Sequence, residues 1–187
     1  MIFGRSEGVP AVNGYEAYRP FLRRDFEYRC AYCLRHEFFF GGGEAGEIDH
    51  YRPRHLFPDL IAEYSNLYWS CRKCNAIKSS KWPSEEQAGR GLRFLDPCAE
   101  DHDDHWVVQA DGTLEPLTSV GEYTVIQIRL NRAALTHLRR FLHQTQERIR
   151  AIKAALMEAS LSPEVHLGLL AEMSAMDVLV HPPVFTF

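Results

Sequence analysis

Apolar residues recur at helical spacing in the first part of the chain. Tyr18, Leu22 and Phe26 are four residues apart, which predicts an amphipathic helix within residues 15–29. Pro20 falls inside this segment, so we expect the helix to begin there, with proline in its first turn. The residues before it are rich in glycine, proline and polar groups, and they predict a loose lead-in.

Shorter patterns follow, and each is bounded by a turn signal. Residues 47–51 and 66–69 predict two strands, the first of them ended by a proline. Residues 75–81 predict a short helix that also stops before a proline. Ser84 and Gln87 have the spacing of a capping box, which predicts the start of another small helix.

The carboxyl-terminal part combines a hairpin signal with a long helical pattern. Asp111-Gly112 lies between two short segments and predicts a tight β-hairpin. A long helix is expected over residues 131–157, with Asn131 as its N-cap. Its seam alternates steps of three and four residues, at Leu135, Leu138, Leu142, Thr145, Ile149, Ile152 and Leu156. This seam favours packing on the chain's own core, with an intermolecular coiled coil as the alternative. Ser162-Pro163 predicts the start of a final helix.

Length and composition place the chain among ordinary globular proteins. It has 187 residues, of which 45% are apolar and 25% charged, and this mixture argues against a wholly disordered, collagen-like or coiled-coil chain. No apolar run approaches the roughly 20 residues that span a bilayer, and the amino terminus lacks the apolar stretch of a secretory signal. We therefore expect a soluble, cytoplasmic protein with no membrane partner.

The net charge of −4 conceals a segregation of sign along the chain. Residues 51–95 carry eight basic and four acidic side chains, whereas residues 96–128 carry eight acidic and no basic ones. Residues 129–153 contain seven basic side chains and a single acid, Glu147. A mean charge therefore does not exclude a polyanionic partner. The acidic block is either a solvated loop or a surface that repels stray anions.

Four of the five cysteines form two Cys-x-x-Cys pairs, Cys30 with Cys33 and Cys71 with Cys74. Without an export signal, disulfides are disfavoured by the reducing compartment. Two such pairs supply the four thiolates of a tetrahedral structural zinc site, so we expect Zn²⁺ there. The alternatives are a redox pair or reduced core thiols. Cys98 has no partner in this pattern and is expected to be a plain thiol.

The residues between the cysteine pairs carry candidate chemistry. Asp49 and His50 are adjacent on a predicted strand, so their side chains point to opposite faces, and one of them can face a metal while the other faces a water. Asn66 can donate and accept, and it could hold the imidazole of His50 in one tautomer. Asn75 directly follows a cysteine ligand, so a zinc site would fix its position. Such rigidity suits a ligand of a second, harder metal.

The chain presents, in order, Cys-x-x-Cys, Glu-Ile-Asp-His-Tyr-Arg-Pro, Asn-Leu and Cys-x-x-Cys-Asn-x-x-Lys. This order, over about residues 26–82, resembles the zinc-stapled HNH endonucleases of the ββα-metal fold. The resemblance implies an α+β protein with three parts: a loose lead-in at 1–14, a nuclease core with the zinc knuckles at 15–93, and a hairpin with a mainly helical region at 94–187.

The resemblance also implies roles for individual residues. Asp49 and Asn75 would hold one catalytic divalent cation, Mg²⁺ or Mn²⁺, because oxygen ligands favour such metals over zinc. His50 would be the general base that activates water, and Asn66 would orient it. Glu47 would be either an outer-shell carboxylate or an exposed strand residue.

Basic side chains flank these motifs. Arg52, Arg54, Lys78 and Lys81 are the expected nucleic-acid contacts, because phosphate binding needs local positive charge. Each one taken alone is equally typical of a solvated surface. Double-stranded DNA is the expected partner, with RNA left open.

Beyond residue 82, Phe-Leu-Asp-Pro-Cys at 94–98, the hairpin and the helix start near Asn131 resemble the HNH component of Septu-type anti-phage defence, which works beside an ATPase. The function implied is metal-dependent hydrolysis of DNA phosphodiester bonds in prokaryotic defence, with an ATPase subunit as a partner and self-association open. The alternative is a non-catalytic zinc-stapled module that binds nucleic acid or a partner protein.

Overall fold

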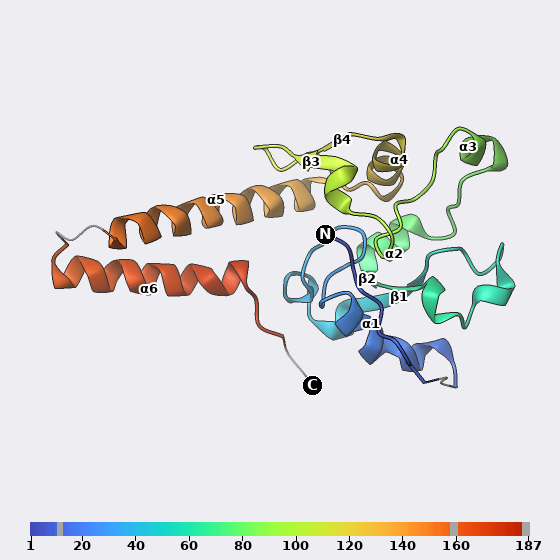
Figure 1. Cartoon of the computed structure of the whole chain (residues 1–187), viewed down its shortest axis with the longest axis horizontal. Coiled ribbons are helices and arrows are strands. Elements are labelled where there is room, and N and C mark those ends of the chain that lie inside the picture. Colours follow the sequence, from blue (N-terminus) through green and yellow to red (C-terminus); the bar gives the residue numbers. More distant parts are fainter. Residues whose placement is uncertain (11–12, 158–160, 185–187) are drawn as a thin grey trace.

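The computed structural model describes residues 1–10, 13–157 and 161–184. It is an α+β protein, as the sequence predicts, with two small antiparallel hairpins and several helices (Figure 1). The helices are α1 Arg19–Asp25, α2 Arg72–Lys78, α3 Glu85–Gly89, α4 Ser119–Ile128, α5 Ala133–Leu156 and α6 Pro163–Val180. The strands are β1 Gly46–His50, β2 Leu67–Cys71, β3 Trp106–Val108 and β4 Leu114–Pro116.

The β1–β2 hairpin and α2 form a ββα unit at the centre of the molecule. β1 and β2 pair antiparallel from Gly46 opposite Cys71 to His50 opposite Leu67. α2 begins at the residue after β2, so the last residues of the strand lie next to the first turn of the helix. Gly46 is required here, because a Cβ at this position would overlap the indole of Trp69. The predicted strands at 47–51 and 66–69 are confirmed to within two residues.

The first helix begins near the predicted proline and ends earlier than its pattern suggests. α1 has Pro20 in its first turn, and it buries Leu22 and the following Phe26 completely. Glu27 and Tyr28 have positive φ angles of 48° and 57°, which a continuing helix does not allow. The chain therefore turns toward the first cysteine pair after Asp25.

Capping residues set the first residue of each of the two short helices α2 and α3. α2 begins three residues before the predicted start, because the Cys71 side chain accepts the N–H of Cys74 and caps the helix. It ends before Ser79, whose φ is 49°. α3 has the predicted capping box, in which Ser84 and Gln87 each bind the other's backbone.

The predicted second hairpin is confirmed as β3–β4, with Gly112 at a φ of 84°. The predicted cap of α5 is wrong. Asn131 uses its amide to bind both backbone groups of Leu114, at 2.7 and 2.8 Å, so it joins the hairpin to the helical region. α5 begins two residues later, after Arg132, and has no side-chain cap. α4 was not predicted, and its Thr124 accepts the N–H of Leu95 at 2.8 Å in the core.

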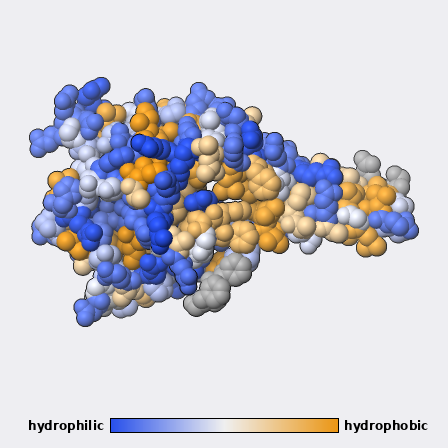
Figure 2. Space-filling model, turned by 180° about the vertical axis from the view of Figure 1, so that it is seen from behind, coloured by the Kyte–Doolittle hydropathy of each residue, from blue (hydrophilic) through white to orange (hydrophobic). Residues whose placement is uncertain are grey.

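α5 and α6 form an antiparallel helical pair that projects from the rest of the molecule (Figure 1). Leu135 of the predicted seam packs in the main core, as expected, whereas Thr145, Ile149 and Ile152 are buried in the part of α5 that pairs with α6 and lie outside that core. α6 begins at Pro163 with Ser162 as its cap, as predicted. Figure 2 shows apolar side chains gathered along this pair. Within the described residues, no helix combines the length and apolar character needed to cross a membrane.

The hydrophobic core contains residues from all three parts into which the chain was predicted to divide. Phe3 is 1% exposed, and its N–H bonds to the carbonyl of Pro97 at 2.9 Å, so the expectation of a loose lead-in is wrong at this end. Phe94 is fully buried and accepts the Tyr51 hydroxyl through its carbonyl at 2.8 Å. The boundary predicted between residues 93 and 94 therefore does not separate two cores.

Candidate functional site

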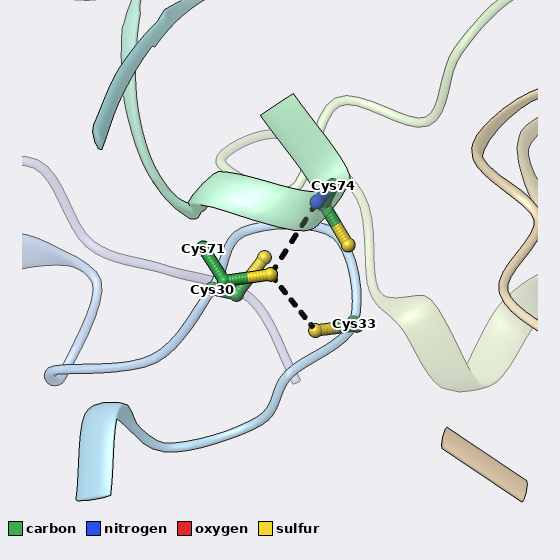
Figure 3. Close-up of side chains that lie close together, drawn as sticks. All are labelled: Cys30, Cys33, Cys71 and Cys74. Atoms are coloured by element: carbon green, nitrogen blue, oxygen red, sulfur yellow. Dashed lines mark hydrogen bonds between the residues drawn. The ribbon is translucent and has the colours of Figure 1, made fainter. Parts of the chain in front are cut away.

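The four paired cysteines come together in one buried cluster (Figure 3). Cys30 and Cys33 follow α1, Cys71 ends β2, and Cys74 lies in α2, and their sulfurs are all within 4.8 Å of one another. A tetrahedral zinc with bonds of about 2.3 Å holds its sulfurs about 3.8 Å apart. Cys33 Sγ and Cys71 Sγ are 4.0 Å apart, which fits such a site. Hydrogen bonds from Cys30 and the other two thiols lower the pKa of Cys71, which favours a thiolate.

An arginine from the helical region contacts this cluster. Arg132 Nη2 donates to Cys74 Sγ at 3.1 Å, and Arg132 directly precedes α5. A charged donor stabilises a thiolate, because it compensates part of the negative charge on sulfur. The helical region is therefore joined to the cysteine cluster by a polar contact as well as by the core.

We predict that Arg132→Ala lowers the zinc affinity of the cluster by about 10-fold, because partners of this kind tune metal ligands. The measurement is zinc transfer to a competing chelator at several chelator concentrations. Arg140→Ala is the matched control, because Arg140 is an exposed arginine in α5, the helix that follows Arg132. Equal zinc affinity in the two variants would show that the Arg132 contact does not act on the metal.

A cleft of about 590 Å³ opens beside the ββα unit. Of the residues expected at the site, Asp49, His50, Arg54 and Asn75 line it, and Glu47 joins them. Residues from before the first cysteine pair also line the cleft, namely Tyr15, Glu16 and Arg19. The sequence pattern did not indicate these three, because they lie outside the motifs, in the 3-10 helix Tyr15–Tyr18 and at the start of α1.

His50 lies at the end of β1 and is held on two sides. Its Nε2 is 2.9 Å from the carbonyl oxygen of Ile61, and the Tyr15 ring packs edge-on against it with centroids 4.7 Å apart. If Nε2 donates to that carbonyl, Nδ1 is left as the nitrogen that can accept a proton. Burial lowers the pKa of His50, which favours the neutral imidazole that a general base needs.

The expected contact between Asn66 and His50 is not made. Asn66 Oδ1 accepts the N–H of Arg52 at 2.8 Å, and Nδ2 donates to the carbonyls of Arg52 and Leu60 at 3.1 and 3.2 Å. Asn66 thus fixes the loop between the strands, and this loop carries the Ile61 carbonyl. Its effect on His50 is indirect, and the prediction of direct orientation is wrong.

The expected pair of metal ligands is also arranged differently. Asp49 is 4% exposed, and its Oδ2 accepts the Tyr32 hydroxyl and lies 2.9 Å from Lys78 Nζ. The Asn75 side chain instead contacts Glu47, with Nδ2 2.6 Å from Oε2. A carboxylate and an amide that share one open cleft are a donor set that suits Mg²⁺ or Mn²⁺.

The predicted nucleic-acid contacts divide into exposed and buried residues. Lys78 has no exposed surface and also donates to the His50 carbonyl at 2.8 Å, so its predicted contact with nucleic acid is wrong. Lys81 is exposed and donates to the Gln127 carbonyl. Arg52 and Arg54 are exposed, and Arg54 lines the cleft. These three remain available to a polyanion.

Comparison with known proteins agrees with this geometry. Residues 30–81 match the HNH endonuclease family. The chain is 26% identical over 150 residues to the Septu protein PtuB of Bacillus mycoides (strain KBAB4), and the match covers 66% of this chain and 50% of that protein. The chain thus spans about half the length of the curated relative it matches. No solved structure matches it. Residues 30–81 are therefore similar to HNH endonuclease domains, and the chain as a whole is similar to a Septu component.

Proposed function

We propose, from the similarity of residues 30–81 to HNH endonuclease domains, that this chain is a metal-dependent endonuclease that hydrolyses DNA phosphodiester bonds in prokaryotic defence. The observation that carries the proposal is one cleft shared by His50, a carboxylate of β1 and the amide of Asn75. A zinc ion at the cysteine cluster would be structural. α2 carries both Cys74 of the cluster and Asn75 of the cleft, so a bound zinc would fix the position of Asn75 in the cleft.

The chain's own residues supply the proton transfer and the positioning in this proposal. His50, held by Ile61 and Tyr15, removes a proton from the attacking water. Asn75 and a β1 carboxylate would hold a divalent cation, which when bound would polarise the scissile phosphate and stabilise the leaving oxygen. Arg54 at the cleft contacts a backbone phosphate. Such chemistry requires no recognition of base edges.

The likeness to the Septu protein PtuB supports a place in a defence complex. We propose a cytoplasmic complex with an ATPase subunit as the partner and double-stranded DNA as the substrate. The second candidate is a zinc-stapled module that binds nucleic acid without cutting it.

Purified chain is incubated with plasmid, linear DNA and RNA in the presence of Mg²⁺, Mn²⁺ or EDTA. The proposed function requires DNA strand breaks with a divalent cation and none with EDTA. A shift of DNA mobility without breaks under every metal condition would favour the binding module. Breaks in RNA alone would correct the substrate and leave the reaction class unchanged.

We predict that Arg54→Ala weakens DNA binding and reduces by about 1 the slope of log affinity against log salt, because one phosphate contact is lost. Binding is measured in EDTA at several salt concentrations, so that cleavage does not interfere. Arg90→Ala is the control, because Arg90 is an exposed arginine at the end of α3, outside the cleft. An unchanged slope in Arg54→Ala would remove this residue from the DNA contact.

A further inference from the structure

Arg19 is a basic side chain of the cleft that lies outside the residues similar to HNH endonucleases. It is the first residue of α1, whereas the match to that family begins at residue 30. One side of its guanidinium is held by backbone groups, because Nη1 donates to the carbonyls of Gly43 and Gly46 at 3.1 and 3.0 Å. The group also lies over the Trp69 ring, with its carbon 5.1 Å from the ring centroid. These contacts fix the guanidinium in one position.

The other edge of this guanidinium has no partner. Within residues 1–10, 13–157 and 161–184, Nε and Nη2 of Arg19 make no hydrogen bond and the side chain forms no ion pair. Neither nitrogen is enclosed by protein, so both are open to a ligand in the cleft. The nearest carboxylates along β1 have cations of their own, since Glu47 pairs with Arg72 and Asp49 with Lys78. The positive charge of Arg19 is therefore available to an anion.

The geometry of the free edge suits a phosphate. Nε and Nη2 carry parallel N–H groups, and such a pair matches two oxygens of one phosphate. A guanidinium that is already held in place loses little conformational freedom when it binds. A nucleic acid in the cleft would offer phosphates to this edge.

Arg19 and the proposed base lie at opposite ends of β1. Arg19 is held at Gly46, the first residue of the strand, and His50 is the last. A strand rises about 3.3 Å per residue, so the backbones at these two ends are about 13 Å apart. Each strand of duplex DNA carries one charge per about 3.4 Å of axis, so this distance spans more than one phosphate. The two ends of β1 therefore match different phosphates.

We propose that Arg19 binds a backbone phosphate that flanks the scissile phosphate. This inference rests on the proposed function and extends its substrate contact beyond the residues similar to HNH endonucleases. In this arrangement Arg19 fixes the path of the nucleic acid across the cleft, and it does not contact the reacting atoms. Its loss therefore weakens binding and leaves the chemical step unchanged.

The experiment measures binding of a short labelled DNA duplex to the zinc-loaded full chain, in buffer free of other divalent cations and at several salt concentrations. Arg19→Met keeps an apolar stem against Trp69 and removes the charge. We expect it to raise the Kd by about 10-fold, because a bidentate, charge-assisted contact is lost. The slope of log affinity against log salt should fall by about 1. Arg19→Lys keeps the charge without the fork, so it should keep the slope and raise the Kd by about 3-fold.

Arg24→Met is the matched control. Arg24 belongs to the same helix, is exposed, and also lies over an aromatic ring, that of Phe21, but it does not line the cleft. Its Kd should stay within about 2-fold of the wild type, because solvent and salt screen an exposed charge away from the ligand. Zinc content and melting temperature are measured for each variant. If Arg19→Met does not fold, Arg19→Lys decides, and a wild-type Kd in that variant overturns the inference.

Single-turnover cleavage at saturating enzyme separates a flanking phosphate from the scissile one. The rate in Arg19→Met should stay within about 3-fold of the wild type, because an interaction that is equal in the ground state and the transition state does not change the chemical step. A larger fall at saturation would place Arg19 on the scissile phosphate and overturn the inference. A wild-type Kd and salt slope in Arg19→Met would also overturn it.

The outcome for Arg19 is distinguishable from the outcome for the proposed function. A raised Kd in Arg19→Met together with no DNA cleavage by the wild type would keep the phosphate contact and remove the nuclease. Metal-dependent cleavage by the wild type together with an unchanged Kd in Arg19→Met would keep the nuclease and remove Arg19 from its substrate contact.

Discussion

His50→Ala is expected to lower the rate of DNA cleavage by about 100-fold or more, the usual scale for losing a general base. Zinc content and DNA affinity should stay at wild-type values, and the melting temperature should fall by only about 2–8 °C, because a buried side chain with one polar contact is removed. The imidazole contacts the Ile61 carbonyl and the Tyr15 ring, and neither contact involves the cysteine cluster. Single-turnover cleavage with excess enzyme measures the chemical step apart from binding.

His55→Ala is the matched control for this variant. His55 lines the same cleft but is exposed, and the proposed mechanism gives it no role. Its cleavage rate should remain close to that of the wild type. If His50→Ala instead cut DNA as fast as His55→Ala, His50 would not be the base and the proposed mechanism would fail.

Cys71→Ser is expected to unfold the ββα unit and release its zinc. Cys71 supplies one of the four sulfurs and also caps α2 by accepting the N–H of Cys74. Structural zinc binding contributes about 10–16 kcal/mol in small zinc-dependent peptides, which is comparable to the whole stability of a domain, about 5–15 kcal/mol. Metal analysis after gel filtration measures the zinc, and thermal unfolding with circular dichroism measures the fold.

Cys98→Ser controls for the loss of a thiol as such. Cys98 is half-buried, lies outside the cluster, and has its pKa raised to about 11 by burial, so it is a neutral thiol. This variant should retain zinc and melt close to the wild type. Stoichiometric zinc and a normal melting temperature in Cys71→Ser would show that the four-cysteine site does not support folding.

Elements with a strong local cause were predicted well. The capping box at Ser84 and the Asp111-Gly112 turn each act within a few residues, and the structure has both. The same holds for the proline at the start of α6. α4 was not predicted, although it has a local N-cap in which the Thr118 side chain accepts the N–H of Gly121.

Polar side chains with several possible partners were predicted poorly. Lys78 follows a basic pattern typical of phosphate binding, yet it is buried and paired with Asp49. Asn66 and Asn131 carry amides that suit many roles, and both bind backbone groups of other segments. Their partners are set by which segments the core brings together, and no short motif encodes that arrangement.

The sequence by itself determined the cysteine cluster, the two strands that precede α2 and the presence of His50 and Asn75 beside that cluster. These features depend on ligand spacing and on local backbone geometry, which act over a few residues. Only the tertiary structure decided that Asp49 is buried against Lys78 while Glu47 stays partly exposed, although both carboxylates line the cleft. Glu47 and Asp49 have the same chemistry and the same strand face, so the difference arises from Lys78 and Tyr32, which packing places against Asp49 alone.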